Sequence, residues 1–255
     1  MVNMENIQRL KEMIDESSKI VFFGGAGVST ESGIPDFRSK DGLYNQHDVR
    51  FDMYQPEYLL SHSCLMHEPK VYFEFHRQKM DTRNIQPNNA HKYLAKLEEM
   101  GKLNGIVTQN IDGLHQKAGS KKVYEIHGSA LRNYCMKCGT SYPVDFIFDS
   151  TDPIPTCDYC GGVVRADITL YEEGLPEDQV NGAMRAIGTA DMMIIGGTSL
   201  TVYPAASFVN YFNGKYIVII NQSELAFRES ENTLIIKDRI GEVFTELAKL
   251  QGITL

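Results

Sequence analysis

The sequence from residue 20 to residue 38 reads IVFFGGAGVSTESGIPDFR. Its apolar start, Ile20 to Phe23, is typical of a short strand buried on both faces. Glycines at positions 24, 25 and 27 follow. Such a turn lets the backbone approach a phosphate, and a helix after it would point its N–H groups at the anion. Thr30 stands where the usual dinucleotide fingerprint has its third glycine, so this turn alone is equally typical of any α/β protein.

Short apolar runs like the first one recur along the chain. They occupy residues 106–108, 192–195, 216–220 and 234–236. Helical patterns lie between them, including one after Pro87 that Gly101 stops and a last one from Ile240 to Leu250. An amphipathic helix is expected within residues 1–18. This alternation predicts an α/β fold, a Rossmann-like open parallel sheet with helices on both faces.

Composition and charge exclude several classes of protein. The chain has 255 residues, of which 42% are hydrophobic and 23% are charged, as in ordinary globular proteins. A net charge of −8 disfavours a general nucleic-acid or anionic-membrane binder and suits a cationic partner such as a lysine-rich peptide. No apolar run is long enough for a membrane span, and the first residues do not resemble a signal peptide. We therefore expect a cytoplasmic protein.

Four of the five cysteines form two pairs with the spacing of a metal site. Cys135-x-x-Cys138 and Cys157-x-x-Cys160 are separated by 18 residues, and a glycine follows each pair. This pattern predicts a tetrahedral zinc bound by four thiolates, which leaves no open position and is therefore structural. Two disulfides or four unrelated thiols are the alternative, and a nucleic-acid-binding zinc ribbon is another. Cys64 is expected to be an ordinary small apolar residue.

The residues that follow the glycine turn resemble a known family. The run from Gly25 to Arg38 is similar to the hallmark of the sirtuins, the NAD-dependent protein deacylases, of bacterial type. Further sirtuin motifs follow in the same order as in the family, and the resemblance covers almost the whole chain. They are TQNIDGLH at 108–115, His127-Gly128, the two cysteine pairs, GTSL at 197–200 and PAA at 204–206.

The resemblance implies a site for NAD and acyl-lysine. His127 is expected to be the general base, and an ordinary imidazole pKa near 6.5 suits that role. Asn110 and Asp112 are expected to be catalytic residues that hold the ribose and the nicotinamide carboxamide. Gln109 would hold the ribose, and Ile111 would line the nicotinamide pocket. The other positions that the resemblance assigns to NAD are Ala26, Thr30, Phe37, Arg38, Gly196, Thr198, Ser199, Asn221, Ser223 and Asp238.

Two stretches interrupt the alternation of strands and helices. We expect one catalytic domain spanning residues 1–255. Its large Rossmann-like part would cover about 1–40, 86–128 and 166–255. A helical insert and cofactor loop would cover about 41–85, and a zinc module about 129–165.

The chain departs from the sirtuin pattern where the acyl substrate would bind. The family segment Arg-Pro-x-(Ile/Val)-Val-x-Phe-Gly-Glu, which lines the acyl-lysine tunnel, reads RADITLYEE at 165–173, so that Thr169, Tyr171 and Glu172 differ. Glu172 and Glu173 would attract basic residues beside the target lysine or form an exposed acidic turn. Sirtuins that prefer succinyl groups carry Tyr-x-x-Arg in the helical insert, where this chain has Phe75-His76-Arg77-Gln78. Neutral acyl groups, acetyl first, are therefore expected.

These observations predict an NAD-dependent protein-lysine deacetylase. It would transfer the acyl group to ADP-ribose and release free lysine, nicotinamide and O-acetyl-ADP-ribose. Its co-substrate would be NAD, its metal one structural zinc ion, and its partners acyl-lysine proteins or peptides, with no nucleic acid or membrane. A monomer is expected. The alternatives are an NAD-dependent protein ADP-ribosyltransferase, which His127 disfavours, and a non-catalytic NAD sensor, which intact Asn110 and Asp112 disfavour.

Overall fold

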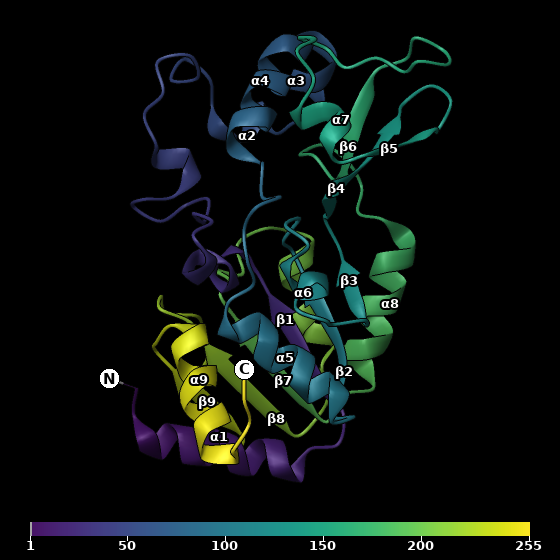
Figure 1. Ribbon diagram of the computed structural model, residues 1–255. Helices are drawn as coiled ribbons and strands as arrows, with labels where there is room; N and C mark the ends of the chain where they lie inside the picture. Colours follow the sequence, from purple (N-terminus) through teal and green to yellow (C-terminus); the bar gives the residue numbers. More distant parts are fainter. Residues whose placement is uncertain (1) are drawn as a thin grey trace.

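The apolar runs form a six-stranded parallel sheet in the computed structural model, which describes residues 2–255. Along the sheet the order is β3-β2-β1-β7-β8-β9, and every neighbouring pair is parallel. The predicted open parallel sheet is therefore confirmed (Figure 1). Its strands are β1 (Ile20–Gly24), β2 (Leu103–Thr108), β3 (Val123–Glu125), β7 (Met192–Gly196), β8 (Tyr216–Ile220) and β9 (Thr233–Ile236).

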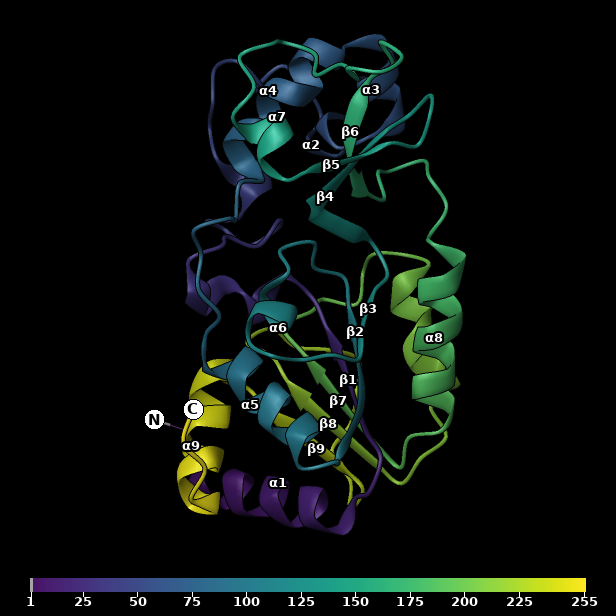
Figure 2. The same ribbon diagram turned by 45° about the vertical axis from the view of Figure 1, so that its right-hand side comes forward.

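Helices cover both faces of this sheet (Figure 2). Successive strand residues point to opposite faces, so Phe22 and Ile194 lie on one side and Phe23 and Ile195 on the other. The first face packs against α1 (Met4–Glu16), α5 (Asn89–Glu99) and α9 (Ile240–Gln251). The second face packs against α8 (Glu177–Gly188) and the 3-10 helix η4 (Ala205–Tyr211). The doubly wound arrangement is the one predicted.

The N-terminal helix is confirmed as α1, although Met1, which belongs to the expected segment, lies outside the described residues. Among the helices of residues 2–255, none is long and apolar enough to cross a membrane.

The glycine turn is not followed by the α-helix that its sequence suggests. Two 3-10 turns take its place, η1 (Ala26–Val28) and η2 (Thr30–Ser32). Gly33 then has a left-handed φ of 92°, and Pro35 has no N–H with which to continue a helix. The turn is therefore followed by 3-10 turns and not by an α-helix whose N–H groups could point at an anion. Residues 25–38 instead form a loop beyond the end of β1.

The two insertions pack together into a second, smaller lobe (Figure 1). Cys64, Tyr72 and Phe73 of the first share a buried core with Ile147 and Ala166 of the second. The first insertion contains η3 (Leu43–Asn45), α2 (Pro56–Leu59), α3 (His62–His67) and α4 (Pro69–Lys79). The second forms an antiparallel sheet of order β5-β4-β6, with β4 (Gly128–Cys135), β5 (Ser141–Pro143), α7 (Asp145–Phe148) and β6 (Val164–Ile168). The small lobe thus draws its core from both insertions.

Candidate active site and metal centre

The residues assigned to NAD lie on loops at the carboxyl ends of the parallel strands. The strand order reverses between β1 and β7, where Gly24 and Gly196 are register partners. Ligands of open α/β sheets bind at such a switch point, outside the carboxyl ends of the strands. Because the assigned residues follow β1, β2, β3, β7, β8 and β9, the fold gathers them along one edge.

Two glycine turns meet by backbone contact at this switch point. The N–H of Gly27 donates to the carbonyl of Gly197 at 2.8 Å. A Cβ on Gly27 would come within 2.8 Å of the Gly197 Cα, and a Cβ on Gly197 would collide with the Val28 backbone. The glycines are therefore needed for the approach of the two loops, in addition to any approach of a phosphate.

The His127 ring is oriented by the main chain directly after β3. Its Nδ1 lies 3.0 Å from the carbonyl oxygen of Gln109. Only a protonated Nδ1 can donate to a carbonyl, so in the neutral ring Nε2 is left as an acceptor. Burial lowers the pKa of His127, and the bond to Gln109 opposes this shift only in part. A neutral imidazole with a free Nε2 is the form that a general base requires.

Ser29 connects the two other residues expected to be catalytic. Its hydroxyl donates to Asp112 Oδ2 at 2.6 Å and accepts from Asn110 Nδ2 at 3.1 Å. The N–H of Leu114 donates to the second Asp112 oxygen at 2.9 Å. Burial raises the pKa of Asp112, although hydrogen bonds oppose the shift. Sequence reasoning missed Ser29, which it could have found because the residue lies inside the Gly25–Arg38 run.

Two buried histidines lie behind this network. His91 Nε2 is 3.4 Å from the Ser29 hydroxyl oxygen, and the His91 ring meets the His115 ring edge-on at 4.8 Å. Burial lowers the pKa of both imidazoles, to about 4 for His91. Both rings are therefore neutral near pH 7 and support the Ser29 loop by packing.

Polar contacts join the loops that would hold the rest of the cofactor. Gln109 Nε2 donates to the Thr198 hydroxyl at 3.0 Å, which ties the loop after β2 to the loop after β7. Thr30 donates to the Gly27 carbonyl at 3.0 Å within the glycine turn. Together with the bond from Gly27 to Gly197, the Gln109 bond joins the loops after β1, β2 and β7.

The adenosine end of the predicted site is less tightly organised. The Asn221 amide, after β8, donates to the Ser223 hydroxyl at 2.9 Å. Ser199 and Asp238 make only local contacts among the described hydrogen bonds, to Thr201 and to the N–H of Arg239, both at 2.8 Å. Their polar atoms are at the expected edge, and their assignment to NAD rests on the resemblance alone.

Phe37 and Arg38 lie on the loop after the glycine turn and contact the small lobe. The half-buried Phe37 ring is 5.3 Å from the Tyr44 ring, and Ile111 belongs to the same apolar cluster. The Arg38 guanidinium donates to the Tyr171 hydroxyl at 3.1 Å and lies 5.5 Å from the centre of the Tyr44 ring. Arg38 therefore contacts aromatic side chains of this loop and of the 165–173 segment.

The four paired cysteines converge as a metal site requires. Their sulfur atoms all lie within 4.8 Å of one another, with Cys135–Cys160 at 3.5 Å and Cys138–Cys157 at 3.6 Å. A tetrahedron with Zn–S bonds of about 2.3 Å has edges of about 3.8 Å, whereas a disulfide bond measures about 2.05 Å. All five cysteines are free, so the disulfide alternative is wrong. The donor set fits one structural zinc ion.

Local hydrogen bonds contact three of the four cysteines. The N–H of Gly139 donates to the Cys135 carbonyl at 2.9 Å and closes the turn that presents the first pair. The Tyr142 hydroxyl donates to Cys157 at 3.2 Å. Hydrogen bonds from Thr140 lower the pKa of Cys138 to about 6, which favours the thiolate that binds zinc.

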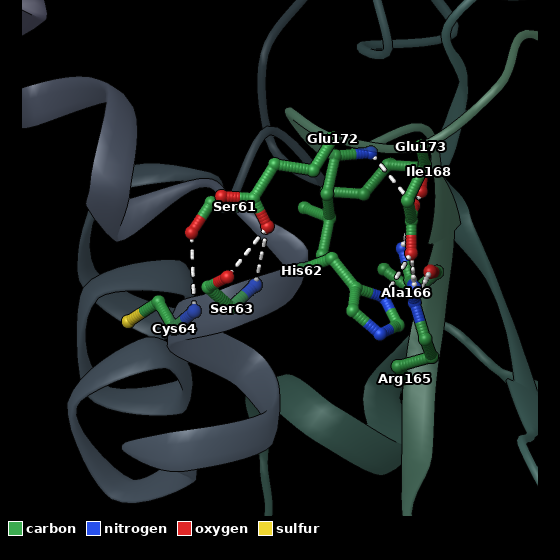
Figure 3. A network of polar contacts seen from close by, with 10 residues as sticks. Ser61, His62, Ser63, Cys64, Arg165, Ala166, Ile168, Glu172 and Glu173 are labelled. Atoms are coloured by element: carbon green, nitrogen blue, oxygen red, sulfur yellow. Dashed lines mark hydrogen bonds and ion pairs between the residues drawn. The ribbon is translucent and has the colours of Figure 1, made fainter.

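The 165–173 segment is fixed to helix α3 by two consecutive carboxylates (Figure 3). Arg165, which is 2% exposed, donates to both oxygens of Glu173, and His62 Nδ1 is 2.9 Å from the same carboxylate. Glu172 accepts from the N–H and the hydroxyl of Ser63 at 2.9 and 2.7 Å. Glu173 therefore balances a buried arginine, a role that neither alternative for the acidic pair included.

Arg77 is the cation that the helical insert has near Phe75. Arg77 on α4 donates to the carbonyls of Ile147 and Asp152 at 2.9 and 2.6 Å, both in the cysteine-bearing insertion. The preceding Phe75 packs edge-on against Phe51 at 5.1 Å. The Arg77 guanidinium is thus bonded to the second insertion, and the preference for neutral acyl groups stays a prediction.

Comparisons with known proteins give a single answer. The model of the Sir2 family matches residues 25–204. The NAD-dependent protein deacetylase of Clostridium acetobutylicum is 53% identical over 95% of this chain and 98% of its own length. That of Clostridium perfringens is 55% identical over 94% and 97%.

Solved structures agree with the sequence comparisons. A Sir2 complex with a p53 peptide and NAD+ has a TM-score of 0.84 and 34% identity, covering 97% of this chain and 99% of that one. A Sir2 complex with deacetylated p53 peptide and 3'-O-acetyl ADP ribose has a TM-score of 0.86 and 33% identity, with the same coverage. Both the sequence motifs and the fold lead to one conclusion: the chain belongs to the Sir2 family.

Proposed function

We propose that this protein is an NAD-dependent protein-lysine deacetylase. NAD supplies the ADP-ribose that takes the acyl group, and nicotinamide leaves. The observation that carries the proposal is the edge of the sheet where His127, with a free Nε2, accompanies the Asn110–Ser29–Asp112 network. The names of the curated relatives and the ligands of the Sir2 structures support the same reaction.

His127 is the proton acceptor in this proposal. The Gln109 carbonyl holds Nδ1–H, so Nε2 can take a proton from a ribose hydroxyl and allow that oxygen to attack the acyl carbon. Asn110 and Asp112, fixed through Ser29, hold the ribose and the nicotinamide carboxamide. Since these side chains are already hydrogen-bonded in place, little reorganisation is needed when the cofactor binds.

Phe37 and Ile111 keep water from the ribose carbon that loses nicotinamide. Both pack against the apolar cluster of the first insertion, and water at that ribose carbon would hydrolyse NAD unproductively. In the same proposal Ala26, Thr30, Gln109, Gly196 and Thr198 surround the phosphates and ribose. Arg38, Ser199, Asn221 and Asp238 complete the cofactor contacts.

The acyl preference is proposed to be for acetyl over succinyl. With an acetyl-lysine peptide, nicotinamide should be released from NAD and the acetyl group lost from the peptide only when NAD and protein are both present. A matched succinyl-lysine peptide should react at least about tenfold more slowly, because a carboxylate without a cation is costly to bury. Faster turnover of the succinyl peptide would overturn the preference. NAD-dependent labelling of proteins with ADP-ribose, and no loss of acetyl, would instead favour the transferase.

The pKa of His127 sets the expected pH dependence. Burial lowers this pKa below its ordinary value of 6.5, so the ring stays neutral to a lower pH than a free histidine. The reaction requires the neutral ring. The value of kcat/KM for the peptide is therefore full above the lowered pKa and decreases as the pH falls through it. We expect the acid limb to have its midpoint below pH 6.5. A midpoint above that value would contradict the assignment.

A cytoplasmic location belongs to the same proposal, since five free cysteines suit a reducing compartment. A monomer that binds no nucleic acid is also proposed, and the net charge of −8 supports the second part.

A further inference from the structure

Tyr171 lies where the 165–173 segment meets the loop after the glycine turn. Its backbone is fixed on the helical insert: Tyr171 N–H donates to Leu60, and Tyr171 O accepts from His62, both at 3.0 Å. The next residue, Glu172, has a left-handed φ of 77° and is bonded to Ser63 on α3 (Figure 3). Tyr171 therefore extends from a rigid base.

The Tyr171 side chain leaves this base and reaches the other loop. Its hydroxyl oxygen accepts from Arg38 Nη2 at 3.1 Å and lies 3.1 Å from the Tyr44 hydroxyl oxygen. Among the described residues, these are the hydrogen bonds that join the 165–173 segment to residues 36–45. A phenylalanine, which the sirtuin pattern has at this position, could form neither.

The two partners of that hydroxyl are themselves tied to Phe37. Tyr44 N–H donates to the Phe37 carbonyl at 2.9 Å, and their rings are 5.3 Å apart. The Arg38 guanidinium lies over the Tyr44 ring, and its Nη2 is also 4.0 Å from Glu57 Oε1. Burial and the bond to Tyr171 raise the pKa of Tyr44, so the Tyr44 hydroxyl stays protonated and neutral. One phenol oxygen thus restrains the loop that carries two residues assigned to NAD.

We propose that the Tyr171 hydroxyl couples the binding of NAD to the binding of the acyl-lysine peptide. The inference rests on the proposed function, which assigns Phe37 and Arg38 to NAD and the 165–173 segment to the peptide. A peptide that lies against the segment also restricts the phenol, and the phenol fixes Arg38 and Tyr44 for the cofactor. Such coupling is reciprocal: each ligand tightens the other by the same factor. Tyr171 acts through Arg38 and Tyr44 and is a positioning residue.

The test uses Tyr171→Phe, which removes the hydroxyl and keeps the ring. Steady-state kinetics should show the KM for NAD, at saturating acetyl-peptide, rising about threefold to tenfold, the size expected for one or two hydrogen bonds. Neither kcat nor the unfolding temperature should change appreciably. Tyr44→Phe should raise the same KM, and the double variant should be no worse than the worse single one. Tyr211→Phe on η4, at 54% exposure, is the matched control and should leave all constants unchanged.

The outcomes distinguish coupling between NAD and peptide binding from a role of Tyr171 in lining the acyl-lysine tunnel. A change in the peptide KM alone, or no change, would overturn the proposal. Calorimetric titration of NAD with and without acetyl-peptide provides the second measurement. If wild-type protein shows no NAD-dependent turnover, the proposed function fails, and the stable ternary complex then gives the coupling factor directly. That factor must exceed one in the wild type and fall toward one in Tyr171→Phe.

Discussion

The variant His127→Ala should lose deacetylase activity, with kcat lower by about 10²- to 10⁴-fold, the usual contribution of a general base. NAD should still bind, because the Asn110–Ser29–Asp112 network and the two glycine turns do not depend on the imidazole. Rapid-quench or steady-state deacetylation gives the first quantity, and calorimetric titration with NAD gives the second. A large loss of kcat with unchanged NAD affinity is expected for a residue that takes part in the chemical step.

His67→Ala provides the control for loss of a histidine. His67 is exposed at the end of α3, and its ring contacts the Ser63 carbonyl one turn earlier. This variant should deacetylate at a rate close to wild type. Full activity in His127→Ala would remove the base from the proposed mechanism. Equal losses of NAD affinity and of kcat would instead assign the ring to cofactor binding.

Removal of the metal should unfold the small lobe and abolish most of the activity. The four sulfurs join β4 to the segment before β6, and their cluster packs on Val164. Structural zinc contributes folding free energy directly, on the order of 10 kcal/mol in small zinc-binding peptides. We expect Cys138→Ser to lower the zinc content well below one ion per chain. Its thermal unfolding should begin at a lower temperature than in the wild type.

Cys64→Ala is the matched control for this prediction. Cys64 is buried in the core shared by the two insertions and lies outside the metal cluster. The variant should keep one zinc ion per chain, measured by atomic emission, although a smaller side chain in the core lowers stability somewhat. Unchanged unfolding and activity of wild-type protein after treatment with a strong chelator would contradict a structural zinc site.

The strands and the metal site could be predicted from the sequence because each depends on a short stretch of residues. Runs such as Ile20–Phe23 and Met192–Ile195 are apolar without alternation, which is typical of a strand buried on both faces. The cysteine spacing also predicted the metal site, since each pair of cysteines lies in its own short turn. The short apolar piece from Val123 to Ile126 placed His127 at a strand end, where the structure has it.

Long-range packing could not be predicted in this way. Nothing local indicates that Tyr72 and Ala166 share a core, and so the union of the two insertions into one lobe came only from the structure. Glu173 looked like part of an exposed acidic turn, yet it balances the buried Arg165. The hydroxyl contact between Tyr171 and Tyr44 joins residues far apart in the chain, and no sequence period indicates it.

The central claim is that the acetyl group passes from lysine to ADP-ribose. Mass spectrometry of a reaction containing acetyl-lysine peptide, NAD and the wild-type protein tests it most directly. We predict free lysine peptide, nicotinamide and O-acetyl-ADP-ribose in equal amounts, with none of them formed when NAD is omitted. Deacetylated peptide accompanied by free acetate and unchanged NAD, or NAD cleavage with the acetyl-lysine intact, would contradict the claim.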